Sequence, residues 1–137
     1  MSLKQYKPIT SSQRGLVLVD KSDLHKGKPF KKLTKGLTKS GGRNNHGHLT
    51  SRRKGGGHKR KYRIIDFKRS FVDIKAKVER IEYDPNRTAH IALIKDEKDQ
   101  YSYIICPQNL KIGQEIISSE NAEIKIKNCL KLKNIPT

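Results

Sequence analysis

The sequence predicts an all-β protein, in which a small antiparallel barrel follows an extended basic arm. Two observations support this prediction. In the second half of the chain, apolar residues alternate with polar ones, and turn signals separate the runs at roughly ten-residue intervals. In the first half, positive charge is concentrated and few apolar residues are available to form a core.

The first predicted segment, residues 1–61, is the basic arm. It contains 17 Lys and Arg residues, two acidic residues and nine of the ten glycines of the chain. Residues 16–19 are its one short apolar run, too little to offset the entropy lost on ordering. We therefore expect this arm to be extended, and disordered in the free protein. The whole chain has a net charge of +18, so a polyanion such as nucleic acid is the expected partner.

The second predicted segment, residues 62–137, has the pattern of short antiparallel strands. Its first run shifts apolar phase by one residue before Ile81 and Tyr83, as a β-bulge would cause. Polar residues around Pro85 predict a turn after this run. The runs and turns follow one another at residues 74–83, 84–87, 89–93, 96–99 and 101–106.

Shorter apolar runs follow at residues 116–117, 124–126 and 130–132, and we expect Pro136 to end the last of these strands. This gives about five or six short strands and no convincing helix. A closed barrel is favoured, because two open sheets of this size would leave long unpaired edges. The OB-fold is the barrel that best matches the pattern.

Two Gly-rich basic stretches, residues 40–48 and 54–61, are the most specific motifs of the arm. Glycine lets backbone N–H groups approach a phosphate closely, while Lys and Arg neutralise phosphates and Asn can contact base edges. An ordinary flexible linker favours Gly and Ser without such charge. The stretches therefore predict an arm that threads along RNA.

Aromatic residues alternate with cations at the start of the second segment. Tyr62, Phe67 and Phe71 could stack on bases beside Arg63 and Lys68, or could anchor the edge of the core. The sequence supports the two interpretations equally.

Several other functions lack support in the sequence. Gly27-Lys28 is followed by Pro29, so it does not form a phosphate-binding loop of the nucleotide-hydrolase kind. The histidines of the arm stand among cations without acidic or Cys partners, which argues against a metal site. No carboxylate pair or Ser/His/Asp grouping indicates an enzyme. No apolar run approaches the ~18 residues of a membrane span. Cys106 and Cys129 are expected to be reduced thiols in or near the core.

Six stretches of this sequence, in their order and spacing, resemble the universal large-subunit ribosomal protein family L-two in its bacterial or organellar form. They are residues 25–30 (HKGKPF), 39–45 (KSGGRNN), 55–59 (GGGHK), 62–69 (YRIIDFKR), 78–87 (VERIEYDPNR) and 134–136 (NIP). The resemblance implies an OB-like barrel, an arm threaded through 23S-type ribosomal RNA, and a role in subunit assembly near the peptidyl-transferase region. It implies no cofactor apart from Mg²⁺ that accompanies the RNA.

Members of that family continue beyond the Asn-Ile-Pro stretch into a second, SH3-like barrel. We therefore expect that this chain is the first part of a split protein, or else a fragment, and that a separate polypeptide supplies the SH3-like part. The abundance of Lys and Ile, which have AT-rich codons, fits an organelle or a reduced bacterium. Because some mitochondrial ribosomal genes are split, we expect a mitochondrial ribosome, with the bacterial cytoplasm as the alternative. No membrane partner is expected.

The sequence thus predicts a structural, non-enzymatic constituent of the large ribosomal subunit that binds RNA beside other subunit proteins. The alternative is a basic protein that condenses nucleic acid without specificity. The residues predicted to contact RNA are Lys26, Lys28, Lys39, Ser40, Gly41, Gly42, Arg43, Asn44, Asn45, His46, His48, Arg52, Arg53, Lys54, Gly55, Gly56, Gly57, His58, Lys59, Arg60, Lys61, Tyr62, Arg63, Lys68, Arg69 and Arg87.

Overall fold

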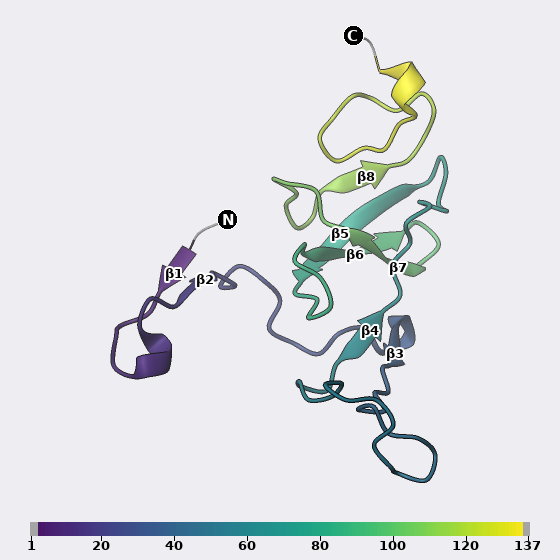
Figure 1. Cartoon of the computed structure of the whole chain (residues 1–137). Helices are drawn as coiled ribbons and strands as arrows, with labels where there is room; N and C mark the ends of the chain where they lie inside the picture. The colour runs from purple at the N-terminus through teal and green to yellow at the C-terminus, as the bar shows by residue number, and fades with distance from the viewer. Residues whose placement is uncertain (1–2, 136–137) are drawn as a thin grey trace.

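The computed structural model describes residues 3–135 of the chain, and nearly all regular structure in this range is β (Figure 1). The strands are β1 (Leu3–Gln5), β2 (Val17–Val19), β3 (Thr34–Gly36), β4 (Lys61–Arg63), β5 (Lys75–Glu82), β6 (Ile91–Asp96), β7 (Tyr101–Ile105) and β8 (Glu115–Ile117). Three short 3-10 helices, η1 (Ser11–Gln13), η2 (Lys31–Leu33) and η3 (Leu132–Asn134), complete the described part, which contains no α-helix. No helix among these residues is long and apolar enough to cross a membrane.

A four-stranded antiparallel sheet in the order β7-β6-β5-β8 forms the centre of the molecule. It confirms the strands expected from the alternation in residues 74–83, 89–93, 101–106 and 116–117. The register of β5 against β6 shifts between Val78 and Arg80, which confirms the predicted β-bulge. Alternation locates these strands well because successive side chains of a strand point to opposite faces.

Both predicted polar turns are confirmed. In the first, the Asn86 N–H donates to the Asp84 carboxylate at 3.0 Å and the Arg87 N–H to the Asp84 carbonyl at 3.4 Å. In the second, the Asp99 N–H donates to the Asp96 carbonyl at 3.2 Å. Short polar side chains stabilise such turns by accepting hydrogen bonds from the backbone two residues further on.

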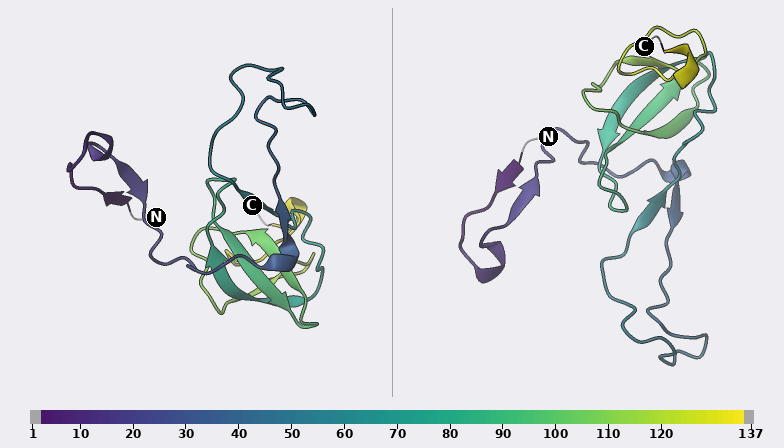
Figure 2. Two further views of the ribbon diagram at one scale, coloured as in Figure 1. Left: turned by 90° about the horizontal axis from the view of Figure 1, so that it is seen from below. Right: turned by 45° about the horizontal axis from the view of Figure 1, so that its top comes forward.

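The segment between β4 and β5 connects the two edges of the sheet. Ile65 makes an isolated bridge to Tyr103 on β7, and Val72 makes one to Ser118, the residue after β8. This path follows the way a barrel would close (Figure 2). Continuous strand pairing around the ring is absent among the described residues, so the closed OB-like barrel stays a prediction while the antiparallel β architecture is established.

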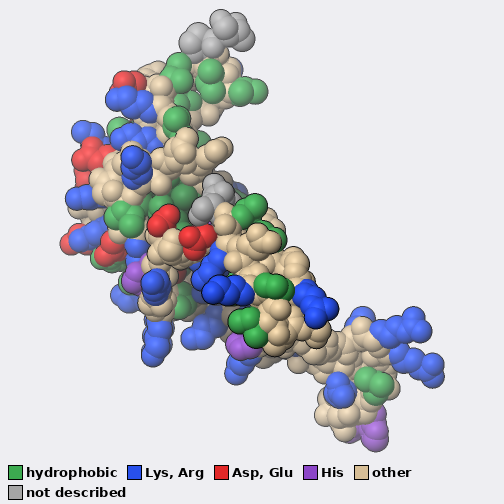
Figure 3. Space-filling view, turned by 90° about the vertical axis from the view of Figure 1, so that its left-hand side faces the viewer, with side chains coloured by type: hydrophobic (Ala, Val, Ile, Leu, Met, Phe, Trp, Pro, Cys, Tyr) green, Lys and Arg blue, Asp and Glu red, His purple; other side chains and the backbone are tan. Residues whose placement is uncertain are grey.

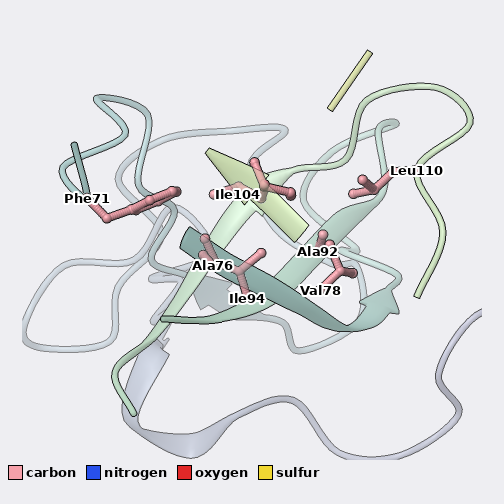
Figure 4. Close-up of a cluster of buried hydrophobic side chains, with 8 residues drawn as sticks. Phe71, Ala76, Val78, Ala92, Ile94, Ile104 and Leu110 are labelled. Carbon is pink, nitrogen blue, oxygen red and sulfur yellow. The ribbon is translucent and has the colours of Figure 1, made fainter. Parts of the chain in front are cut away.

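Strand β6 is buried on both of its faces. Ala92 and Ile94 belong to the larger core cluster, with Phe71, Val78 and other residues that Figure 4 shows gathered on one side of the sheet. Ile91 and Leu93 belong to a second cluster on the opposite face. Residues 1–61 contribute to this second cluster, since Phe30 and Leu33 pack against it.

The expectation of strands at residues 124–126 and 130–132 is wrong. Among the described residues after Ser118, pairing is limited to one bridge, from Cys129 to Ser118, and Leu132 begins η3 with 85% of its surface exposed. The Asn128 side chain instead closes a loop, donating to the Glu123 carbonyl at 2.9 Å and accepting from the Ile117 N–H at 3.3 Å. A strand needs a neighbour along several residues, and the pairing of this segment with the end of β8 stops at Cys129. Pro136 lies outside the described residues.

Residues 1–61 contain more regular structure than the sequence indicates. Strands β1 and β2 pair as a small hairpin that stands apart from the sheet (Figure 1). Further on, the His25 N–H donates to the Ile81 carbonyl at 2.8 Å, and β3 pairs with β4. Hydrogen bonds therefore cross the proposed division after Lys61. That division, and the disorder of the arm in the free protein, stay predictions.

A buried polar network fixes residues 24–36 to the sheet. The Tyr103 hydroxyl donates to the carboxylate of buried Glu82 at 2.9–3.0 Å and accepts the N–H of Phe30 at 2.8 Å. The Arg80 guanidinium pairs with the same carboxylate at 2.7 Å. Burial, aided by the negative charge of Glu82, raises the pKa of Tyr103 above its ordinary value.

Replacing Tyr103 with Phe should lower the free energy of unfolding by about 1–3 kcal/mol, because the Phe30 N–H loses its acceptor and the buried Glu82 carboxylate keeps Arg80 but loses the hydroxyl donor. Urea unfolding at neutral pH measures it. The control is Tyr101→Phe, since the ring of Tyr101 packs on Phe30 while its hydroxyl makes no hydrogen bond to any residue from 3 to 135. Equal losses in the two variants would contradict the role of the Tyr103 hydroxyl.

The stabilisation should also depend on pH. A pKa that is higher in the folded than in the unfolded state stabilises the fold below the unfolded value, about 10 for tyrosine, and the effect is lost as the pH rises through the folded value. The stability difference between wild type and Tyr103→Phe should therefore shrink in alkali. A constant difference up to pH 11 would contradict it.

Candidate nucleic-acid interface

A long basic loop, residues 37–60, joins β3 to β4 and projects away from the sheet (Figures 1 and 2). The two strands at its base pair in antiparallel register, with Thr34 opposite Arg63 and Gly36 opposite Lys61. Both predicted Gly-rich stretches lie in this loop or at its end. The strand pairing therefore brings together the two motifs that the sequence analysis selected.

The tip of the loop is a small hairpin held by its own hydrogen bonds. The N–H groups of Thr50 and Ser51 donate to the Gly42 carbonyl at 2.9 and 3.1 Å. The Asn44 side chain accepts from the His48 N–H at 2.9 Å. Gly42 has a φ of +75°, and a Cβ there would lie 2.3 Å from the Ser51 carbonyl oxygen, so the turn requires glycine.

Positive charge in the loop is not neutralised by the protein. Residues 37–60 contain seven Lys and Arg residues and no Asp or Glu. In the described part of the chain, no residue of this loop takes part in an ion pair. Figure 3 shows the loop as a narrow projection at the lower right with Lys, Arg and His side chains near its end. Phosphates could approach it from several sides.

The end of the loop is anchored through a buried carboxylate. Asp84 is fully buried, and it accepts from the Arg87 guanidinium at 2.6 Å and from the Asn86 amide group at 3.2 Å. The same Asn86 amide donates to the Lys61 carbonyl at 2.8 Å. Arg63 lies 4.0 Å from the carboxylate and also donates to the Lys61 carbonyl, at 2.9 Å. Two guanidinium groups therefore share one carboxylate next to Lys61, the residue that follows the loop.

The structure exposes most of the residues predicted to contact RNA. The exceptions are Gly41, Arg69 and Arg87, which are half-buried, and Gly42 and Arg63, which are buried. Lys26 and Lys28 lie outside the loop, on the segment that crosses the sheet. The sequence did not reveal the interior position of Arg63, because its countercharge, Asp84, lies on a different element and looked like an ordinary turn residue.

The three aromatic candidates separate by burial. Phe71 is 8% exposed and belongs to the core cluster, so the core interpretation holds for it. Tyr62 and Phe67 are 38% and 66% exposed, and the Arg87 guanidinium lies 5.8 Å from the Phe67 ring centre. Exposed rings beside cations suit base stacking, so this interpretation stays a prediction for Tyr62 and Phe67.

The remaining titratable groups give no sign of other chemistry. The described residues include no cluster of three or more His, Cys, Asp or Glu side chains that could hold a metal ion. Cys106 is half-buried against the core and Cys129 is exposed, and both are free thiols. Burial raises the pKa of the Cys106 thiol, which disfavours the reactive thiolate.

Comparison with known families gives one match, to the family described as ribosomal proteins L2, RNA binding N-terminal domain, over residues 30–118. This range holds the basic loop, its anchor and the four-stranded sheet. It leaves out the β1–β2 hairpin and the segment after β8.

Curated relatives match almost the whole chain. A large ribosomal subunit protein uL2 from Rickettsia canadensis is 65% identical over 136 residues, 99% of this chain and 50% of the relative. Proteins of the same name from Rickettsia felis and Rickettsia rickettsii are 64% and 63% identical, over 100% and 99% of this chain and again 50% of each relative. The chain thus spans about half the length of the curated relatives it matches.

Replacing Asp84 with Asn should lower the free energy of unfolding by about 3–5 kcal/mol, because two guanidinium groups would lose their buried countercharge. Urea unfolding checks it. The matched control is Asp99→Asn, which removes the ion pair between the Asp99 carboxylate and Lys95. The Asp99 side chain is 80% exposed, so this substitution should change stability little. A small loss at position 84, similar to that at 99, would refute the anchoring role.

Proposed function

The chain belongs to the family of ribosomal proteins L2, and we propose that it is a structural component of the large ribosomal subunit that binds the subunit's RNA. The name of the matched domain and the names of the relatives support this function. We propose no catalytic role, since the arrangement of charges serves binding alone. Supporting subunit assembly near the peptidyl-transferase region is the finer part of the proposal.

The observation that carries the proposal is the loop of residues 37–60, whose seven Lys and Arg side chains have no acidic partners and whose base is held by the β3–β4 pairing. Lys and Arg side chains that release counterions from phosphates supply most of the affinity of such contacts. The tip is already shaped by its hydrogen bonds, so part of the ordering cost is met before RNA arrives. We propose the exposed members of the predicted contact set as the RNA-binding residues, with Arg63 positioning the loop from within.

We also propose that the sheet and the segment between β4 and β5 together form an OB-like barrel. The bridges from Ile65 to Tyr103 and from Val72 to Ser118 support this, because they connect both edges of the sheet to one segment. A barrel would hide those edges from other chains and hold the loop at a fixed angle.

Two further proposals concern the setting of the chain. One is that a separate polypeptide carries the family's SH3-like part, with a fragment of one longer protein as the alternative. For the location we propose the mitochondrial ribosome, with the bacterial cytoplasm as the alternative. The abundance of Lys and Ile, which have AT-rich codons, suits both, and the Rickettsia relatives support a ribosome of bacterial type in either.

Mass spectrometry of purified ribosomal subunits tests this function directly. The chain should be found in the large subunit at a level equal to that of its other proteins, together with a polypeptide that covers the second half of the relatives. Absence from ribosomes would refute the function. Presence of one continuous longer protein would refute the split alone.

The alternative function, condensing nucleic acid without specificity, needs the charge but neither the fixed loop nor the glycine-dependent turn at its tip. A competition between deproteinised large-subunit RNA and random-sequence duplex DNA separates the two. Preference for the ribosomal RNA at physiological salt supports the ribosomal function, and equal affinity supports the alternative.

Removing loop charges should change the salt dependence of RNA binding. In a variant with Arg52→Gln, Arg53→Gln and Lys54→Gln, the slope of log affinity against log salt should fall by about 2–3 units, or about 0.7–0.9 per lost phosphate contact. The control changes three exposed lysines away from the loop to Gln, at Lys75, Lys77 and Lys111. Filter binding to large-subunit RNA measures both slopes. Equal flattening in the control would show that the loop is not the main electrostatic element.

A further inference from the structure

A cavity of about 470 Å³ lies where the end of the basic loop meets the turn after β5. Its walls come from three parts of the chain: residues 58–61 with Arg63, the residues Tyr83 and Pro85, and Pro29 from the segment that crosses the sheet. This volume falls within the range of about 300–1,000 Å³ that is usual for small-ligand sites. The proposed function does not use the cavity as such.

One side of the cavity is lined by cationic side chains without a nearby acidic one among the described lining residues. Lys59, Arg60 and Lys61 are exposed along one wall, and no acidic residue lines it. Arg63 is more than nine-tenths buried, and its Nε–H has no acceptor among the described residues. It shares the Asp84 carboxylate with Arg87. An under-compensated buried cation next to three exposed ones favours a ligand that carries negative charge.

The other side of the cavity is aromatic and apolar. Tyr83 is 41% exposed, with the Lys21 ammonium 3.5 Å from its ring centre, and Pro29 and Pro85 add flat apolar surface. Nucleotide bases stack on such rings, whereas inorganic phosphate would leave this surface unused. The combination of cations and a stacking surface therefore matches a nucleotide better than a simple anion.

We propose that this cavity receives one unpaired nucleotide of the bound RNA, with its base against Tyr83 and the prolines and its phosphate near Lys59–Lys61 and Arg63. The proposal rests on the function proposed above, because the nucleotide belongs to the same RNA that the loop binds. Bases inside a duplex are stacked and paired, so the site selects a bulged or looped-out nucleotide.

Fluorescence anisotropy with two RNA hairpins tests the proposal. One has a fully paired stem, and the other has the same stem with a single bulged nucleotide, prepared with each of the four bases. The full chain should bind at least one bulged hairpin about tenfold more tightly than the paired one, as expected for one stacked base. Tyr83→Leu should abolish this preference, and Tyr83→Phe should keep it.

The variant with Arg52→Gln, Arg53→Gln and Lys54→Gln serves as the matched control. It should bind both hairpins more weakly and keep the ratio between them, because these residues do not line the cavity. Equal affinity of the wild type for paired and bulged hairpins would overturn the cavity assignment while leaving the proposed function intact. The same holds for a preference that survives Tyr83→Leu. Failure to bind either hairpin at low salt would count against the proposed function itself.

Free uridine monophosphate and inorganic phosphate serve as competitors to identify the source of the nucleotide. Neither should displace the bulged hairpin at micromolar concentration, since the loop contacts add to the affinity of a nucleotide within RNA. Displacement by the free nucleotide would overturn the assignment to RNA, and displacement by phosphate would show that the base surface has no part in binding.

Discussion

A buried carboxylate between two guanidinium groups holds the most highly charged part of this molecule in place. Asp84 bonds to Arg87 and Asn86, and Asn86 bonds in turn to the carbonyl of Lys61, the residue that follows the loop. Seven cations in residues 37–60 repel one another, so the loop cannot stabilise its own position. Its direction depends on the anchor at Asp84 and on the β3–β4 pairing beside it.

The sheet also depends on contacts between the two halves of the chain. Strand β6 buries both faces, and one of them is covered by Phe30 and Leu33 from the first half. The Tyr103 hydroxyl, between Glu82 and the Phe30 N–H, adds a specific polar contact in this layer. A sheet of four short strands is a small core, so it gains from this cover. The segment just before the loop thus helps to stabilise the sheet from which the loop projects.

Local patterns in the sequence predict what local forces decide. The alternation in residues 74–83, its phase shift and the turn at Asp84 are settled by neighbours along the chain, and the structure has all three. The runs at residues 124–126 and 130–132 have the same alternation but no partner strand, and among the described residues neither run forms a strand. The exposure of the loop cations could be predicted from their charge alone. The burial of Arg63 and the contact between Phe30 and Tyr103 could not be predicted, because each depends on residues distant in sequence.

Hydrogen exchange of the backbone amides, with and without deproteinised large-subunit RNA, tests most directly whether the fixed loop is the RNA-binding element. In the free chain, amides of β5, β6 and β7 should exchange slowly, and those of residues 37–60 should exchange fast apart from the bonded tip. On RNA, protection should increase chiefly within residues 37–60 and at the β3–β4 base. Unchanged exchange in the loop, with new protection elsewhere on the sheet, would contradict the central role of the loop.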